Sequence, residues 1–248
     1  MLSNKIIYYG KAKSIIKTED CFTVIQHFRD DITAYNNQKT QIIDGKGMIN
    51  NQISAFVMSA LEKSGIKTHF INTINEREQL VRTLEIIPLE IVIRNITSGS
   101  LCTRLNIQVG MKLISPIIEF FYKNDLLGDP MVNEDHILYY HWLSEQEIKK
   151  IKTTALKIND ITLSFFSRIG IDLVDIKLEF GRLINNRTEI ILADEISPDN
   201  CRLWDCKTRQ CFDKDLFRLN SGDLKAGYLE VLQRIILDNI SISHAVTR

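Results

Sequence analysis

The segment 173–181 constrains the fold of this 248-residue chain more than any other. Its apolar residues alternate at period two, which predicts a β-strand, and its other face carries Asp175, Lys177 and Glu179 in a row. The apolar run 190–193 that follows indicates a sheet buried on both sides. Ionised groups inside a sheet are costly unless they pair with each other, a metal or a ligand. The row therefore predicts a site for a metal-bound phosphate compound. The alternative is an edge strand with a salt-bridged outer face.

The charge balance limits the classes of partner. The chain has 31 basic and 31 acidic residues, so its formal net charge is zero. Nucleic acids and anionic membranes favour a basic excess, and we expect neither as a partner. Small anionic substrates need only local positive charge and remain possible. With 44% apolar residues, the chain can bury the core of one large domain or of two closely packed ones.

The sequence favours a cytoplasmic protein. Lys5, Lys11 and Lys13 interrupt any apolar stretch near the start, so no secretion signal is expected. No run approaches the roughly 20 apolar residues of a membrane span. The five cysteines are odd in number and lack CxxC pairs, which favours reduced thiols over disulfides or structural zinc. The five histidines show no metal-ligand spacing and are expected to be structural or exposed.

The order of elements predicts the fold class. Short apolar runs in the first forty residues, bounded by glycine or charged turns, are typical of antiparallel strands. Further along the chain we expect a helix over 53–61 ending at Gly65, strands over 66–74 and 86–93, a helix from a Ser144–Glu147 capping box to Gly170, and a last helix over roughly 222–238. The sequence therefore predicts an α+β fold, with a small N-terminal antiparallel β lobe (1–83) packed on a larger α/β lobe (84–248).

A first group of candidate site residues follows the opening strand. Gly10 allows close approach of a ligand to the backbone, and alternation places Lys11 and Lys13 on one side. Two ammonium groups beside a tight turn suit a polyphosphate. Lysines at strand ends are usually solvated, however, and the spacing is not that of a Walker A loop.

A second group ends the predicted strand 88–94. Glu90 and Arg94 share a face, and the strand continues toward Ser98, Gly99 and Ser100. An arginine fork with hydroxyl and backbone donors is suited to an oxyanion or phosphate. The alternative is a Glu90–Arg94 interaction followed by an ordinary turn.

A third group of candidate residues lies on and after the strand that is expected to pair with 173–181. Asn185 and Asn186 predict a turn, after which 189–195 pairs as an antiparallel strand. Depending on loop length, Asp194 then lies opposite Lys177 or Glu179. A Glu179/Asp194 pair could hold Mg²⁺, which takes one or two protein carboxylates plus phosphate oxygens. Arg202 is expected in a loop at the strand end. Three softer candidates are the Lys123–Asp129 region, Arg218 before the last helix, and the segment 44–47, whose backbone amides could hold an anion.

Several long motifs resemble those of the SAICAR synthetase (phosphoribosylaminoimidazole-succinocarboxamide synthase) family. They are, in chain order, 10–13, 46–51, 86–94 with 98–100, 123–125, 129–134, 173–181, 194–199 and 202–205. The resemblance covers essentially the whole chain. It implies a SAICAR synthase-like fold with an ATP cleft between the lobes, and a homodimer.

The resemblance also implies the reaction. Such a carbon–nitrogen ligase of purine biosynthesis joins the carboxylate of carboxyaminoimidazole ribonucleotide (CAIR) to the amine of L-aspartate, with ATP and Mg²⁺ as cofactors. A carboxylate is a poor electrophile, so phosphorylation first makes an acyl phosphate, which the amine then attacks. Magnesium and lysines offset charge on the transferred phosphoryl group, and water must be excluded.

The same resemblance implies roles for named residues. Nucleotide binding falls to Gly10, Lys11, Ala12 and Lys13 at the phosphates and Arg82 near the adenine. Metal binding falls to Glu179 and Asp194, with Glu90 and Asp129 at a second metal or the CAIR carboxylate. CAIR is bound by Arg94, Ser98, Gly99, Ser100, Lys123, Asp129 and Arg218. Asp175, Lys177 and Arg202 lie near the reacting carboxylate and aspartate.

One position departs from the family pattern. Related sequences often carry Ser-Ala-x-Asp where this chain has residues 33–36 ending in Asn36, which offers no carboxylate. Two other functions stay open on sequence alone. One is an ATP-dependent kinase or another carboxylate–amine ligase, and the other is a nucleotide-sensing module without catalysis.

Overall fold

The computed structural model describes residues 6–35 and 38–246, and it confirms the predicted α+β class. Its first sheet is antiparallel, with the strand order β1-β2-β3-β7-β6. The bounds are β1 (Ile6–Tyr9), β2 (Lys13–Lys17), β3 (Thr23–Phe28), β6 (Phe70–Asn75) and β7 (Glu78–Arg82). A separate hairpin joins β4 (Asp31–Ala34) to β5 (Lys39–Ile42). The β-rich start is therefore confirmed.

In the larger sheet, β11 pairs with three other strands. The strands of this sheet are β8 (Leu84–Ile96), β9 (Lys112–Tyr122), β10 (Met131–Val132), β11 (Ile171–Leu183), β12 (Asn186–Ala193) and β13 (Cys201–Asp205). One edge of β11 pairs with β8. Along its other edge, β13 pairs with the first half and β12 with the second. The chain between β12 and β13 therefore emerges beside the middle of β11.

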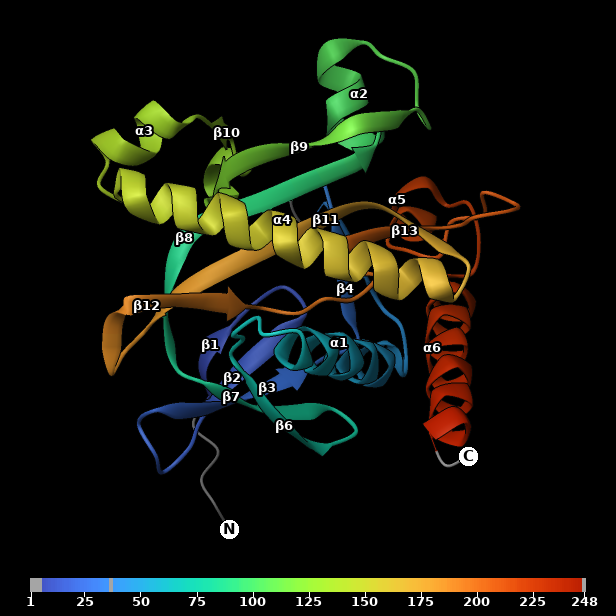
Figure 1. Ribbon diagram of the computed structural model, residues 1–248, viewed down its shortest axis with the longest axis horizontal. Coiled ribbons are helices and arrows are strands. Elements are labelled where there is room, and N and C mark those ends of the chain that lie inside the picture. Colours follow the sequence, from blue (N-terminus) through green and yellow to red (C-terminus); the bar gives the residue numbers. More distant parts are fainter. Residues whose placement is uncertain (1–5, 36–37, 247–248) are drawn as a thin grey trace.

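Helices cover and link the two sheets (Figure 1). They are α1 (Lys46–Lys63), α2 (Gly99–Leu105), α3 (Glu134–Tyr139), α4 (Glu145–Arg168), α5 (Asp215–Leu219) and α6 (Leu224–Val246), with a 3-10 turn η1 (Asp125–Leu127). Helix α4 crosses the larger sheet and packs on β11 and β8. Helix α1 packs on β3 and β6 of the first sheet and also on α4 and α6.

The sequence signals for the two ends of α4 are confirmed. Ser144 Oγ accepts a hydrogen bond from the Glu147 backbone N–H, and Glu147 Oε2 accepts one from the Ser144 N–H at 2.8 Å. This capping box starts α4, and Gly170 follows its end with φ 71°. Helix α6 continues past its predicted end near 238, since no glycine or proline interrupts 239–246.

Both faces of β11 are buried, as the sequence predicts. Its residues Ile176, Leu178 and Phe180 are at most 1% exposed and belong to the main hydrophobic core. On the opposite face, Asp175 and Glu179 are also buried. The edge-strand alternative is wrong, because β11 has partners on both edges.

The register of the β11–β12 hairpin corrects one expectation. Leu183 pairs with Asn186, so the turn is two residues long, and a bulge follows at Arg182. This register sets Ala193 opposite Glu179, and Asp194 is the first residue beyond the strand. Asp194 therefore lies opposite neither Lys177 nor Glu179. It turns the chain away from the sheet with φ 61° and starts the loop 194–200.

Two composition-based expectations can be compared with the described residues. All five cysteines are free thiols. None of the helices described is both long and apolar enough to cross a membrane.

Candidate active site

A cleft of about 300 Å³ lies against β8, β11 and β13, with β4 and α5 also contributing to its wall. Predicted site residues from widely separated segments line it: Lys11, Glu90, Arg94, Ser100, Asp129, Asp175, Lys177, Arg202 and Arg218. The structure therefore brings together most of the residues proposed for substrate binding and catalysis.

Charged residues of β8 and β11 form ion pairs across the strands. Lys177 Nζ lies 2.5 Å from Glu90 Oε1. Arg94 donates to Asp175 at 3.0 Å and to Glu119 at 3.0 Å, and all three side chains are buried. Glu90 thus pairs with Lys177 rather than Arg94. Burial opposes the charge of Lys177, but Glu90 and Glu179 raise its pKa above the ordinary value, so it stays protonated.

Arg202 extends this network, from a strand rather than from the predicted loop. It lies in β13, where the sheet register sets it opposite Asp175. Its guanidinium donates to Asp175 and to Asp215, both at 2.7 Å. Arg218 pairs with the other oxygen of Asp215. The guanidinium groups are therefore held by shared carboxylates and present a cationic wall.

The turn that begins α2 fits closely around this wall. Gly99 has φ 55°, and a Cβ there would lie 2.4 Å from a guanidinium nitrogen of Arg202, so no larger residue fits without movement. Ser98 is the N-cap residue in extended conformation. Ser100 Oγ accepts a hydrogen bond from Arg94 at 3.1 Å. Hydroxyl and guanidinium donors thus meet at one end of the cleft.

Lysines of the turn 10–13 and of the 123–129 loop pair with acids of that loop and of β11. Lys11 Nζ lies 2.6 Å from Asp125 and 3.9 Å from Asp129. Lys123 pairs with Glu179. Asp129 also accepts a hydrogen bond from the Asn124 N–H at 2.9 Å, which closes its loop.

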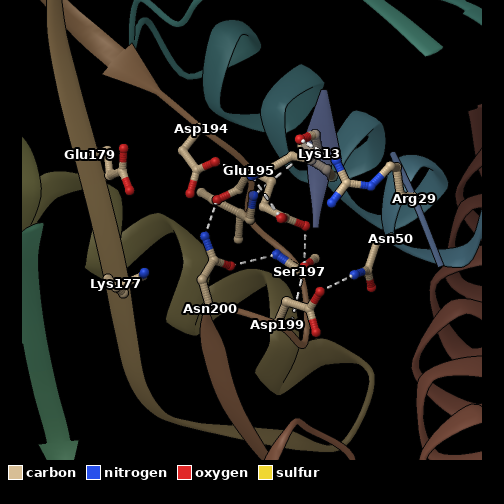
Figure 2. A network of polar contacts seen from close by, with 12 residues as sticks. Lys13, Arg29, Asn50, Lys177, Glu179, Asp194, Glu195, Ser197, Asp199 and Asn200 are labelled. Atoms are coloured by element: carbon tan, nitrogen blue, oxygen red, sulfur yellow. Dashed lines mark hydrogen bonds and ion pairs between the residues drawn. The ribbon is translucent and has the colours of Figure 1, made fainter. Parts of the chain in front are cut away.

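Lys13 makes a double ion pair at the start of the loop 194–200 (Figure 2). It contacts Asp194 and, at 2.8 Å, Glu195. Burial alone would lower the pKa of Lys13, but these two acids raise it above the ordinary value. The predicted phosphate-binding lysines are thus already paired with carboxylates of the 123–129 and 194–200 loops.

Glu179 and Asp194 affect each other's titration. Burial and the charge of Asp194 raise the pKa of Glu179. Burial also acts to raise the pKa of Asp194, but Lys13 and Lys177 lower it to about 2. Two acids in such proximity fit a divalent cation. Among the described residues, no group of three or more His, Cys, Asp or Glu side chains is arranged to hold a metal ion. The pair therefore fits Mg²⁺ held mainly by phosphate oxygens.

Comparisons with known proteins agree with this geometry. The family model of SAICAR synthetase matches residues 6–235. The chain belongs to the SAICAR synthetase family. A phosphoribosylaminoimidazole-succinocarboxamide synthase of Wolbachia pipientis (strain wPip) is 65% identical over 235 residues, covering 95% of this chain and 98% of the relative. Enzymes of this family are ATP-dependent ligases of purine biosynthesis, and this chain is one of them.

Solved structures support the same assignment. The crystal structure of the synthase from Ehrlichia chaffeensis has a TM-score of 0.92 and 54% identity, covering 93% of this chain and 98% of that one. A SAICAR synthetase in complex with ADP has a TM-score of 0.88 and 46% identity, covering 92% and 96%. The predicted SAICAR synthase-like fold is confirmed.

Two positions singled out by the family resemblance lie apart from the cleft or outside the described residues. Arg82 donates to the carbonyl oxygens of Thr68 and Phe70 and is not among the cleft-lining residues. Its proximity to an adenine stays a prediction. Asn36, where relatives often have aspartate, lies outside the described residues.

The turn 10–13 is held by an arginine that sequence reasoning missed. The Gly10 N–H donates to the Lys13 carbonyl at 2.9 Å. Arg29 donates to the Gly10 carbonyl at 2.7 Å, and its own N–H donates to the Ala12 carbonyl at 2.9 Å. Arg29 also stacks on Tyr9, 3.6 Å from the ring centre. A lone arginine after a strand gives no sequence signal for this role.

A buried cluster at the far end of the loop 194–200 was also missed. Asp199 Oδ2 accepts from Lys46 Nζ at 2.6 Å and from Asn50 at 2.9 Å, while Oδ1 accepts from the Tyr228 hydroxyl at 2.7 Å. The Lys46 side chain is only 1% exposed. Lys46, Asn50 and Asp199 all lie in motifs that resemble the family, but their mutual contact cannot be read from spacing.

Proposed function

We propose that the cleft against β8, β11 and β13 is where this chain joins the carboxylate of CAIR to the amine of L-aspartate. The observation that carries the proposal is the row Asp175, Lys177 and Glu179, in which both acids are buried and each member pairs with a charge from another segment. Placing these charged groups within the sheet costs desolvation free energy, which a bound phosphate compound and cation would offset.

The nucleotide would bind on the side of the first sheet. Gly10, Lys11, Ala12 and Lys13 form a tight turn whose two ammonium groups pair with acids of the 123–129 and 194–200 loops. On binding, the phosphates would replace those acids as partners of Lys11 and Lys13. Arg82 would border the adenine. The solved relative in complex with ADP supports nucleotide binding by this fold.

Mg²⁺ would be held by Glu179 and Asp194. A bound Mg²⁺ ion would stabilise the charge that develops on the transferred phosphoryl group. It would also relieve the repulsion that raises the pKa of Glu179. Glu90 and Asp129 are the acids for a second cation or for orienting the CAIR carboxylate, and both line the cleft.

The CAIR phosphate would bind at the opposite end. Arg94, Ser100 and Arg218 supply guanidinium and hydroxyl donors, and Ser98 and Gly99 shape the turn between them. Lys123, paired with Glu179, would reach the bound substrates from the 123–129 loop.

Asp175, Lys177 and Arg202 would surround the reacting carboxylate. Its oxygen attacks the γ-phosphorus of ATP and releases ADP, which leaves an acyl phosphate. The aspartate amine attacks the acyl carbon, inorganic phosphate leaves, and the nitrogen loses a proton. Lys177 would balance charge during both steps, since its pKa keeps it protonated.

The cellular setting and architecture belong to the same proposal. We expect a cytoplasmic homodimer without nucleic-acid or membrane partners. The lobes would divide near residues 83 and 84, where β7 ends and β8 starts in the other sheet.

ADP release tests the reaction. Purified protein with ATP and Mg²⁺ should release ADP only when CAIR and L-aspartate are both present, and the product should be the succinocarboxamide. A panel of other carboxylate and amine acceptors serves as the control for a kinase or a different ligase. Turnover with another acceptor and none with CAIR would overturn the assignment.

A further inference from the structure

One cation that lines the cleft differs from the others, because its side chain has no hydrogen-bond or ion-pair partner among the described residues. The other lining cations all make ion pairs: Lys11 with Asp125, Lys177 with Glu90, Arg94 and Arg202 with Asp175, and Arg218 with Asp215. Lys214 also lines the cleft. Its ammonium group makes no hydrogen bond or ion pair with any residue in the described ranges 6–35 and 38–246.

The position of Lys214 is fixed by its backbone rather than by its side chain. It precedes α5, and its N–H donates to the Pro198 carbonyl at 3.1 Å. This bond ties it to the loop 194–200. A substitution of the side chain leaves the bond in place, so the role of the ammonium group can be tested separately.

The charges around Lys214 explain why it stays unpaired. Asp199 is the acid that acts on it, but both oxygens of Asp199 already accept hydrogen bonds from Lys46, Asn50 and Tyr228. Arg218, Lys177 and Lys46 add like charge. Burial and these three cations lower the pKa of Lys214 to about 8. An anion entering the cleft would relieve this cost.

We propose that Lys214 binds a carboxylate of L-aspartate, an inference that rests on the proposed ligation. The proposed partners of the CAIR phosphate are the guanidinium groups of Arg94 and Arg218, with Arg202 beside them. L-Aspartate brings two carboxylates, and its amine must reach the acyl carbon near Lys177. Lys214 acts electrostatically on the same region and is the lining cation left without an anion. It is therefore a specificity-determining residue for the amino-acid substrate.

Steady-state kinetics of Lys214→Met test the inference. Loss of a hydrogen bond to a charged group should raise KM for L-aspartate by roughly tenfold or more. KM for ATP and for CAIR should change less than about twofold, because neither substrate is expected to contact Lys214. Lys214→Arg should recover much of the loss because it restores the charge. The control is Lys225→Met, a partly exposed lysine of α6 outside the lining residues.

A second measurement separates binding from folding. Succinate has both carboxylates of aspartate but no amine, so it should inhibit competitively against L-aspartate and lose affinity in Lys214→Met as aspartate does. A higher KM for CAIR in place of L-aspartate would assign Lys214 to the other substrate and overturn the inference. Equal kinetics in Lys214→Met and wild type would overturn it too, while the ligation itself would stand. Wild-type protein inactive with CAIR and aspartate would overturn both.

Discussion

The two ends of the loop 194–200 each hold a lysine–aspartate pair, but the pairs differ in how fully the carboxylate is used. At the far end, Asp199 accepts hydrogen bonds from Lys46, Asn50 and Tyr228. Although burial acts to raise its pKa, Lys46 and Lys214 hold it well below the ordinary value. At the near end, Asp194 pairs with Lys13, which also contacts Glu195.

This difference separates a pair with a structural role, at Asp199, from a pair with a proposed role in ligand binding, at Asp194. Asp199 accepts hydrogen bonds from buried donors of α1 and α6, so the Asp199 pair holds α1, α6 and the loop together. The Asp194 pair can exchange partners, since Lys13 has a second acid and Asp194 lies near Glu179. At the proposed nucleotide site, lysines and acids therefore pair with each other, and bound MgATP would replace these pairs.

The largest effect should come from breaking the framework pair. Lys46→Met leaves Asp199 buried without its cation, which should lower the free energy of unfolding by about 3–5 kcal/mol. Urea denaturation measures this as a lower midpoint. The double variant Lys46→Met, Asp199→Asn should recover a large part. A Lys46→Met protein as stable as wild type would show that the Asp199 pair is not framework.

Breaking the exchangeable pair should affect turnover rather than folding. Asp194→Asn keeps the shape and removes the charge, so we expect kcat to fall roughly a hundredfold or more, the scale of removing one electrostatic group from an active site. The unfolding midpoint should move little. The control is Asp172→Asn, which removes a β11 acid that pairs with Arg209 away from the cleft. Near-normal activity at limiting magnesium would exclude Asp194 as a metal ligand.

A smaller effect should follow from changing the second acid of Lys13. Glu195 is buried and accepts a hydrogen bond from the Ser197 hydroxyl. Glu195→Gln should leave Lys13 dependent on Asp194 alone and raise KM for ATP by roughly tenfold, with less effect on kcat. KM for L-aspartate serves as the internal control. An equal rise in the KM values of all three substrates would indicate general disorder of the loop rather than misplacement of Lys13.

Local patterns predicted much of this fold, whereas contacts between distant segments were not predictable. Alternation in 173–181 identified β11 and its buried charges, and the Ser144–Glu147 box identified the start of α4. The placement of Asp194 depends on a two-residue turn and a bulge that the spacing does not determine. Arg202 was assigned to a loop because the five-residue strand β13 has little pattern of its own.

The missed residues share a physical cause. Lys46 at the start of α1 has the sequence appearance of a solvated helix terminus, and its partner Asp199 lies 153 positions further along. Burial of a charge is a tertiary property, visible only when both partners are placed. Lys214 was missed for the same reason. Its environment depends on the positions of several residues that are distant in the sequence, and the sequence alone does not give those positions.

The smallest predicted effect is a pH dependence of inhibition by succinate. It tests the contrast between charged groups that are already paired and Lys214, which is not paired with any of the described residues. Because the folded protein lowers the pKa of Lys214 to about 8, the ammonium group is present below that pH and is lost above it. Inhibition by succinate should therefore weaken between pH 7 and 9 by up to about tenfold, since each pH unit above a pKa removes roughly nine-tenths of the charged form. Succinate itself stays fully ionised over this range. Lys214→Arg should remove this dependence, because a guanidinium does not titrate there. Lys177, Lys46, Arg218 and Asp199 face Lys214; the pKa of Lys177 is raised above its ordinary value and that of Asp199 is lowered, so neither of these two changes charge over this range. A profile that Lys214→Arg leaves unchanged would place the titrating group elsewhere.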